Sequence, residues 1–518
     1  MHCTGLSVIR GTEISSFDVE VLDVIAQEAG LRGPRMLVRA SGPAVDASGI
    51  GQGFSGSPIL CGGRNAGAIS EGLGEYGNHV VLATPIEEML GDRPARPTGA
   101  RRDPRLARAA RPLAGPLTVS GLSSRTRGLL MRAADRAGLT VLAAPAAPAA
   151  GYAPVDLRPG ASVAVALSTG DVAVGGVGTV TYRDGDSVWA FGHPLDGLGR
   201  RSLFLQDSYV FGVISNPLGI PPALTFKLAS SAGHVLGSVT SDTFAAVAGT
   251  IGAEPASIPL KVVARGEGGK QVVLESRLAD ERGFGYGAGL SVVAPLAASQ
   301  ALEGLARSAG PVTFSLCMRF RVRELRRPIG FCNPYFAVDR AMADLRNAGD
   351  LVDSFDLAPL HIDRAEVRVR ARPGVTEDVL IEADAPRRVR AGQRIGVRLV
   401  VQRRRGGRRR ISGSLRVPRS LRPGRHTIVL AGNGQHFSPE QLLMGEFEAI
   451  VIEFLAAGEE EPEARSPREL GRALRRLRRP LGIEARLKRR ELGLVVRSSD
   501  VSFGGRVPLT VRVLRRRR

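Results

Sequence analysis

A glycine-rich turn between two apolar, strand-like stretches is the feature that most narrows what this chain can fold into. The turn reads Gly53-Phe54-Ser55-Gly56-Ser57-Pro58. A serine flanked by glycines is what an acyl-transfer nucleophile requires, because glycine lets the backbone approach a scissile carbonyl. The amides of Gly53 and Ser55 are then placed to form an oxyanion hole. The alternative is a hairpin whose serines only satisfy backbone groups.

The composition favours many short strands over a helical bundle. Of 518 residues, 64 are glycine and 33 are proline, and aromatic residues make up only 5%. Such a chain suits strands joined by tight turns. The hydrophobic content of 43% is that of a globular protein. A chain of this length suits about two to four domains.

Periodicity and turn signals divide the chain into six segments. The last one contains a helix capped by Ser466, with Pro467 in its first turn and Glu469 completing a capping box. The fold class expected from this order is mainly β. The segments are a serine-bearing β segment (1–92), a linker with one helix near 123–137 (93–154), a second, histidine-bearing β segment (155–260), a mixed α/β segment with helices near 297–308 and 334–348 (261–362), a β-sandwich (363–460), and the C-terminal helix with a basic tail (461–518).

Two sequence blocks together resemble a known family. The first takes in Met1-His2-Cys3-Thr4-Gly5 and runs through the Ser55 turn to Thr84-Pro85-Ile86-Glu87-Glu88-Met89-Leu90. The second contains Gly178-Thr179-Val180-Thr181-Tyr182 and Trp189-Ala190-Phe191-Gly192-His193-Pro194. Both are similar to segments of the SpoIVB-type sporulation serine peptidases, and chymotrypsin-like peptidases carry a similar serine turn. The resemblance implies chymotrypsin-like β-barrel halves, with Ser55 as nucleophile and His193 as general base.

The chain departs from that family in two ways. Ser55 precedes His193 by 138 residues, whereas in the family the histidine block comes first. A triad is defined by geometry, so a permuted order is compatible with catalysis. The family's aspartate aligns near residues 39–43, which hold no carboxylate. Asp46 is the nearest replacement, with Asp18 and Asp196 as alternatives.

Histidines other than His193 carry weaker signals. His79 is the reserve candidate for the base because it lies close in sequence to the serine segment, and His234 matches no motif. No histidine has metal-ligand spacing around it, so neither a metal nor a cofactor is expected.

Three functions are compatible with these observations. The first is a SpoIVB-like serine endopeptidase acting on protein or peptide substrates. The second is a catalytically inactive peptidase-fold scaffold or binding protein of the cell envelope, as the missing acid and the reversed order suggest. The third is a polyanion-binding protein, because the net charge is +21. An anionic envelope surface is a partner that this charge suits, and no dedicated nucleic-acid site is expected.

The cysteines and the N-terminus bear on the compartment. None of the four cysteines forms a Cys-x-x-Cys pair; Cys317 and Cys332 flank a turn, where they form either a disulfide or buried thiols. No apolar stretch is long enough for a membrane-spanning helix. Because Met1 already lies inside the first family-like block, we expect an exported or envelope-associated protein whose export signal is missing from this sequence.

Overall fold

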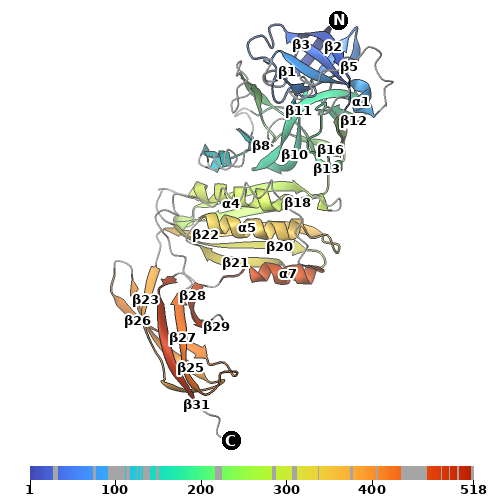
Figure 1. Cartoon of the computed structure of the whole chain (residues 1–518). Coiled ribbons are helices and arrows are strands. Elements are labelled where there is room, and N and C mark those ends of the chain that lie inside the picture. The colour runs from blue at the N-terminus through green and yellow to red at the C-terminus, as the bar shows by residue number, and fades with distance from the viewer. Residues whose placement is uncertain are drawn as a thin grey trace.

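The computed structural model shows a mainly β protein. Two β units lie at the N-terminal end, a sheet covered by helices follows, and two further sheets form the C-terminal end (Figure 1). The structure describes residues 1–26, 33–73, 78–91, 111–112, 117–124, 126–128, 130–131, 141–146, 151–215, 225–282, 287–305, 312–335, 338–373, 377–403, 406–432, 464–479, 481–488, 490–498 and 501–514.

The first unit is a closed ring of six antiparallel strands. Its hydrogen-bonded order is β4-β1-β2-β3-β6-β5, and β5 pairs back with β4. Alternate residues of β2 such as Phe17 and Val19 face the interior, while Asp18 between them is exposed. The disulfide Cys3–Cys61 joins β1 to β4. The elements are β1 (His2–Val8), β2 (Ile14–Ile25), β3 (Arg35–Ser41), β4 (Pro58–Cys61), β5 (Arg64–Gly72), β6 (Val80–Pro85) and the short helix α1 (Ile86–Leu90), with β7 (Arg111–Pro112) added at the edge of β5.

The second unit is another closed ring of six antiparallel strands. Its order is β10-β13-β16-β17-β12-β11, closed by pairing of β11 with β10. The strands are β10 (Ser162–Gly170), β11 (Ala173–Asp184), β12 (Ser187–Ala190), β13 (Gly199–Asp207), β16 (Val235–Asp242) and β17 (Val247–Ile251). A two-stranded hairpin, β14 (Val210–Ile214) and β15 (Phe226–Ala229), forms single bridges to the first unit at Gly11 and Gln52.

The middle unit is a sheet with helices packed on one face. Its order is β21-β20-β22-β18-β19, and β19 also pairs with β10 of the second ring. The large apolar cluster of the molecule lies between this sheet and the helices. The elements are β18 (Ser257–Arg265), the 3-10 turn η2 (Glu267–Gly269), β19 (Gln271–Ala279), α4 (Leu290–Leu305), β20 (Val312–Val322), β21 (Ile329–Tyr335), α5 (Val338–Asp353), β22 (Ile362–Pro373) and α7 (Pro467–Arg476).

Two C-terminal sheets enclose one hydrophobic cluster. One has the order β26-β25-β23-β30 and the other β24-β31-β27-β28-β29. The strands are β23 (Glu377–Asp384), β24 (Arg388–Arg390), β25 (Arg394–Arg403), β26 (Arg408–Arg416), β27 (Gly424–Gly432), β28 (Leu481–Leu487), β29 (Arg490–Ser498), β30 (Ser502–Gly504) and β31 (Arg506–Leu514).

The helix signals in the sequence correspond to real helices, with shifted bounds. Ser466 caps α7 by accepting a bond from the Glu469 amide, as expected, and Leu470 and Leu474 are buried in the middle core. The helices expected near 297–308 and 334–348 are α4 and α5. Ser123 accepts the Thr126 amide and caps a helical stretch within 123–137. Within the described residues, no helix combines the length and apolar character needed to cross a bilayer.

Two sequence expectations differ from the structure, and a third is largely untested. The segment 461–518, expected as a helix with a basic tail, also contains the four strands β28 to β31; in β31 the buried residues Leu509, Val511 and Val513 alternate with outward-facing ones. The basic tail itself, expected over 515–518, lies outside the described residues. Residues 141–144, expected in a linker, form β9 (Val141–Ala144), which pairs with β8 (Leu117–Ser120). Most of the linker expected over 93–116 lies outside the described residues.

The cysteines are paired rather than free. Cys317 and Cys332 lie directly opposite each other on β20 and β21 and form a disulfide. Together with Cys3–Cys61 this leaves no free thiol in the structure. The reading as buried thiols is therefore wrong for this structure.

Candidate active site

The Ser55 turn lies where the two rings meet. It precedes β4 of the first ring and is bonded to β11 of the second. The Thr179 amide donates to the Ser55 carbonyl at 2.8 Å, and the Thr181 hydroxyl donates to the Gly56 carbonyl at 2.8 Å. From its own ring, the turn is held by the bond from the Gly56 amide to the Ile69 carbonyl at 2.8 Å. The nucleophile candidate is thus fixed between two separately closed barrels.

Glycine is required at position 56 by both conformation and space. Its φ is +88°, in the left-handed region that side chains rarely adopt. A Cβ there would lie 2.0 Å from the Thr179 carbonyl oxygen and 2.5 Å from the Phe191 amide nitrogen. The glycine expected to permit close approach to a substrate therefore also permits close approach of the second ring.

Two backbone amides of the turn are left without a bonding partner. The amides of Phe54, Gly56 and Ser57 each donate a hydrogen bond to a backbone carbonyl. The amides of Gly53 and Ser55 donate none within the described part of the chain. These are the two amides that the sequence assigns to an oxyanion hole.

The Ser55 hydroxyl is also unpartnered. Its side chain is 0% exposed, and its Oγ has no hydrogen-bond partner among the described residues. Ser57, two residues later, is fully engaged: its Oγ donates to the Phe54 carbonyl at 2.6 Å and lies 2.9 Å from Ser7 Oγ. Of the two serines, only Ser55 has a free hydroxyl.

The turn that carries His193 packs beside the Ser55 turn. It follows β12, with left-handed φ values of 71° at Phe191 and 68° at Gly192. The Thr84 hydroxyl of the first ring donates to the Gly192 carbonyl at 2.6 Å. A Cβ on Gly192 would lie 3.2 Å from the Ile69 carbonyl, the same oxygen that accepts the Gly56 amide. The two turns are therefore neighbours across the interface between the rings.

The hydrogen bonding of His193 defines its tautomer. Its Nδ1 lies 2.7 Å from the Pro194 carbonyl oxygen. A carbonyl can only accept, so Nδ1 carries the proton and, in the neutral ring, Nε2 carries the lone pair. Nε2 has no partner among the described residues, so it does not bond Ser55 Oγ in this structure. The histidine has the tautomer of a general base.

Burial dominates the titration of His193. The side chain is 0% exposed, and this burial lowers its pKa below the ordinary value. The bond to the Pro194 carbonyl and the charge of Glu71 act in the opposite direction, and the charge of Arg35 adds to the lowering. Glu71 and Arg35 form a buried ion pair at 2.9 Å. His193 is therefore neutral at neutral pH, and Glu71 is the carboxylate in its electrostatic surroundings.

The carboxylates expected as the third triad member have other partners. Asp46 is exposed and accepts the Gly42 amide at 2.7 Å. Asp18 lies on the exposed face of β2, opposite Ser41. Asp196 pairs with Arg201. No bond from Asp18, Asp46 or Asp196 to His193 occurs within the described residues, and the Pro194 carbonyl occupies the position where an acid was expected.

The other two histidines considered from sequence lie in different surroundings. His79 Nδ1 lies 3.2 Å from the Ala40 carbonyl oxygen. His234 has the carboxylate partner that His193 lacks, with Nδ1 2.9 Å from Asp207. Asp207 also accepts hydrogen bonds from the hydroxyl of Tyr152 and the amide of Val155. The Asp207–His234 pair therefore holds the segment that leads into the second ring.

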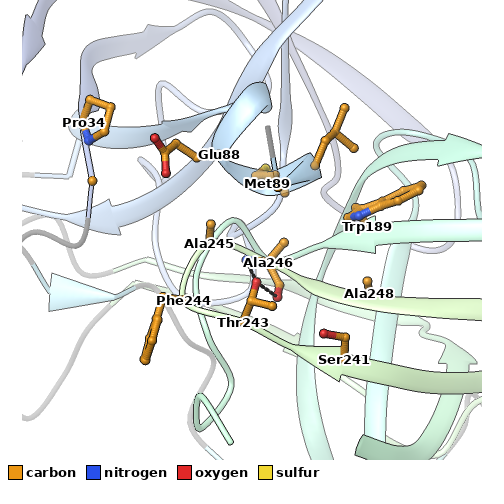
Figure 2. A pocket seen from close by; sticks show the side chains of 13 residues that line it. Pro34, Glu88, Met89, Trp189, Ser241, Thr243, Phe244, Ala245, Ala246 and Ala248 are labelled. Atoms are coloured by element: carbon orange, nitrogen blue, oxygen red, sulfur yellow. Dashed lines mark hydrogen bonds between the residues drawn. The ribbon is translucent and has the colours of Figure 1, made fainter. Parts of the chain in front are cut away.

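A cavity of about 830 Å³ lies between the rings near the His193 turn. Figure 2 shows Glu88 and Met89 from α1 on one side and Trp189, Phe244 and Ala246 from the second ring on the other. Met89 and Ala246 pack against Ala68, which is a neighbour of Gly192. The cavity is thus one layer of side chains away from the His193 turn.

Asp242 fixes the loop after His193. Its carboxylate accepts the amides of Leu195, Asp196 and Gly197, each at 2.8 Å. Burial raises the pKa of Asp242 to about 6. The loop conformation that follows the histidine is therefore specified by a buried carboxylate that sequence reasoning did not single out.

Part of the positive charge lies far from this site. On β20 and β22, Arg319, Arg321, Arg364 and Arg368 are exposed and border a depression of about 210 Å³. Glu366 pairs with Arg368 in the same depression.

Within the described residues, no group of three or more histidine, cysteine, aspartate or glutamate side chains is arranged to hold a metal ion.

Comparison with known proteins yields no relative for this chain: no family model, no curated protein and no solved structure matches it.

Proposed function

We propose that this protein is a serine-type endopeptidase of the SpoIVB type, with a chymotrypsin-like double barrel as its catalytic core. One observation carries the proposal: at one junction between two closed barrels, four groups needed for acyl transfer have no hydrogen-bond partner among the described residues. They are Ser55 Oγ, His193 Nε2 and the amides of Gly53 and Ser55. Buried polar groups are almost always bonded, so this set of free groups favours a substrate site.

The reaction assigns each of these groups a role. Ser55 Oγ attacks the carbonyl carbon of a peptide bond while His193 Nε2 takes the hydroxyl proton. The oxygen of the tetrahedral intermediate accepts bonds from the Gly53 and Ser55 amides. His193 then gives its proton to the leaving nitrogen as the C–N bond breaks, and water hydrolyses the resulting ester.

The absence of a bonded acid changes how the base is supported. The Pro194 carbonyl sets the tautomer, which is one of the two tasks of a triad aspartate. The second task, stabilising the imidazolium, falls to the charge of Glu71, which Arg35 partly offsets. We therefore expect a slow peptidase rather than a digestive one.

Both catalytic side chains are fully buried. A peptide can reach Ser55 only after the chain around it moves, so the described conformation is a closed one. This burial also favours a second candidate function, a catalytically inactive peptidase-fold scaffold of the cell envelope. The two candidates differ in whether Ser55 reacts.

Two finer features belong to the same proposal. The two C-terminal sheets with their common core support a β-sandwich, which suits a binding or assembly role appended to the peptidase. Both cysteine pairs form disulfides. Because disulfides persist in oxidising compartments, this supports an exported or envelope-associated protein.

Reaction with a fluorophosphonate tests the proposal. We expect one adduct on the folded full-length chain, mapped by mass spectrometry to Ser55, and none on Ser55→Ala. The matched control is Ser16→Ala, which removes an exposed serine of β2 and is expected to label normally. His193→Asn is expected to slow labelling by about 10²- to 10⁴-fold. A folded wild-type chain that is not labelled at Ser55 favours the inactive scaffold.

A further inference from the structure

Lys227 is buried directly behind the Ser55 turn. It lies on β15 and is 3% exposed. Its Nζ lies 2.7 Å from Ser7 Oγ and 3.2 Å from Thr179 Oγ1, and it stands over the ring of Phe54 at 4.6 Å from the ring centre. No carboxylate pairs with it among the described residues. A buried lysine without a counter-ion destabilises the fold, which favours a functional role for a lysine at this position.

The hydrogen bonds that start at the Lys227 side chain have a defined donor and acceptor at each step. An ammonium group only donates, so the hydroxyls of Ser7 and Thr179 accept from Lys227 and donate onward. Ser7 then donates to Ser57 Oγ, and Ser57 donates to the Phe54 carbonyl at 2.6 Å. Thr179 donates to the Gly53 carbonyl at 3.1 Å. Two chains of hydroxyl groups therefore connect the lysine to carbonyls of the turn.

The main chain of Lys227 holds the same turn. Its amide donates to the Gln52 carbonyl at 2.9 Å, and the Gln52 amide donates to the Thr225 carbonyl at 2.9 Å. The turn is thus attached to β15 by its backbone and, through Ser7 and Ser57, by the lysine side chain.

Because a peptide unit is planar, a hydrogen bond on its carbonyl also fixes the direction of its amide. In a trans peptide the carbonyl and the amide of the next residue point in opposite directions within one plane. The Gln52 carbonyl is in the same peptide unit as the Gly53 amide, and the Phe54 carbonyl in the same unit as the Ser55 amide. Each free amide is therefore aimed by a bond on the carbonyl at the other end of its own peptide unit.

We propose that Lys227 is a positioning residue that aims the two oxyanion-hole amides of the Ser55 turn, through its backbone at Gly53 and through Ser7 and Ser57 at Ser55. The proposal rests on the peptidase function proposed above. It assigns Ser57 to the support of the oxyanion hole and not to nucleophilic attack.

Two reactions at residue 55 distinguish a positioning role of Lys227 from a general effect of its substitution on folding. Phosphonylation of Ser55 by a fluorophosphonate develops charge on an oxygen and uses the oxyanion hole. Alkylation of a Ser55→Cys variant by iodoacetamide needs an accessible, activated sulfur but no oxyanion hole. We expect Lys227→Met and Ser57→Ala each to slow phosphonylation about 10- to 100-fold. Lys227→Met placed in the Ser55→Cys background is expected to leave the alkylation rate within about threefold, because no oxyanion forms in that reaction.

Matched variants complete the test. Lys261→Met removes a lysine that pairs with Glu275 at the surface, and Ser57→Thr keeps the hydroxyl. The first is expected to label at the wild-type rate and the second to recover labelling relative to Ser57→Ala. Equal losses in both reactions, or no loss in either, would overturn the role of Lys227 while leaving the peptidase intact. If wild-type protein itself is not labelled at Ser55, the proposed function fails, and the inference fails with it.

Discussion

The buried ammonium of Lys227 makes the stability of this protein depend on pH in a way that one substitution removes. Burial lowers the pKa of Lys227 from its ordinary value of 10.5 to about 7. Between these values the unfolded chain binds a proton that the folded chain does not. Stability contributed by this site therefore rises with pH from about 7 to about 10.5 and is lowest below that window. Lys227→Met, a substitution of similar length, abolishes this dependence.

The magnitude follows from linkage between protonation and folding. At about pH 6, the pKa difference destabilises the folded wild-type chain by about 5 kcal/mol relative to a neutral lysine, and at about pH 10 by only about 1 kcal/mol. The loss of bonds to Ser7 and Thr179 adds an offset of about 1 to 3 kcal/mol that depends little on pH. The unfolding free energy of Lys227→Met minus that of wild type should therefore be about 4 kcal/mol higher at pH 6 than at pH 10.

Urea unfolding followed by tryptophan fluorescence measures this difference. Trp189 is the single tryptophan of the chain and lies on β12, which pairs with β11, so it reports on the ring whose Thr179 bonds Lys227. Lys261→Met is the control, because Lys261 is 38% exposed at its side chain. A difference between Lys227→Met and wild type that stays constant from pH 6 to pH 10 would show that Lys227 is solvated or paired, and would refute the reasoning.

Three further outcomes are expected. Gly56→Ala should lower the unfolding free energy by more than about 2 kcal/mol and abolish Ser55 labelling, because its Cβ would meet the Thr179 carbonyl at 2.0 Å; Gly62→Ala, with open space around it, should lower it by about 1 kcal/mol. The rate of Ser55 labelling should be independent of pH above neutrality and should fall only below pH 6.5, the ordinary pKa of histidine. The reason is that His193 acts as a base when neutral and that burial lowers its pKa. A fall in the labelling rate that begins above pH 6.5 would contradict the buried environment of His193. Thiol titration of the denatured, unreduced protein should find no free thiol, and reduction should release all four cysteines; free thiols before reduction would contradict the two disulfides.

The two turns of the candidate site could be found from the sequence because each is a local motif. The glycines between Gly53 and Pro58 favour a tight turn, and the structure has one there, with Gly53 and Gly56 at positive φ. His193 follows an apolar strand and a glycine, and the structure places it in such a constrained turn. Local backbone constraints of this kind are readable in a window of six residues.

The supporting residues could not be found in this way because they come from distant parts of the chain. Ser7 and Lys227 are separated by 220 residues yet bond at 2.7 Å. One signal was present: in a chain with only four lysines among 71 basic residues, Lys227 lies between the apolar residues Phe226 and Leu228. A charged residue at the centre of an apolar strand predicts burial with polar partners.

The partner of His193 was missed for another reason. The sequence search considered carboxylates such as Asp46, whereas the partner is the backbone carbonyl of Pro194. Backbone acceptors exist at every residue, so no composition or spacing marks the one that will be used. The strands between 481 and 514 were missed although β31 carries a period-two pattern, in which the buried residues Leu509, Val511 and Val513 alternate with exposed ones.

The order of Ser55 before His193, the reverse of the order in the peptidase family proposed for this chain, is compatible with how the two rings close. Each ring completes its own hydrogen-bond network, β4 with β5 in one and β10 with β11 in the other, so neither needs the other to satisfy its strands. The serine turn belongs to the first ring and the histidine turn to the second. What joins them is a set of contacts across the interface, such as the bonds from Thr179 to Ser55 and from Thr84 to Gly192. Those contacts are indifferent to which ring is synthesised first, so a site assembled from two closed barrels tolerates an exchange of their order along the chain.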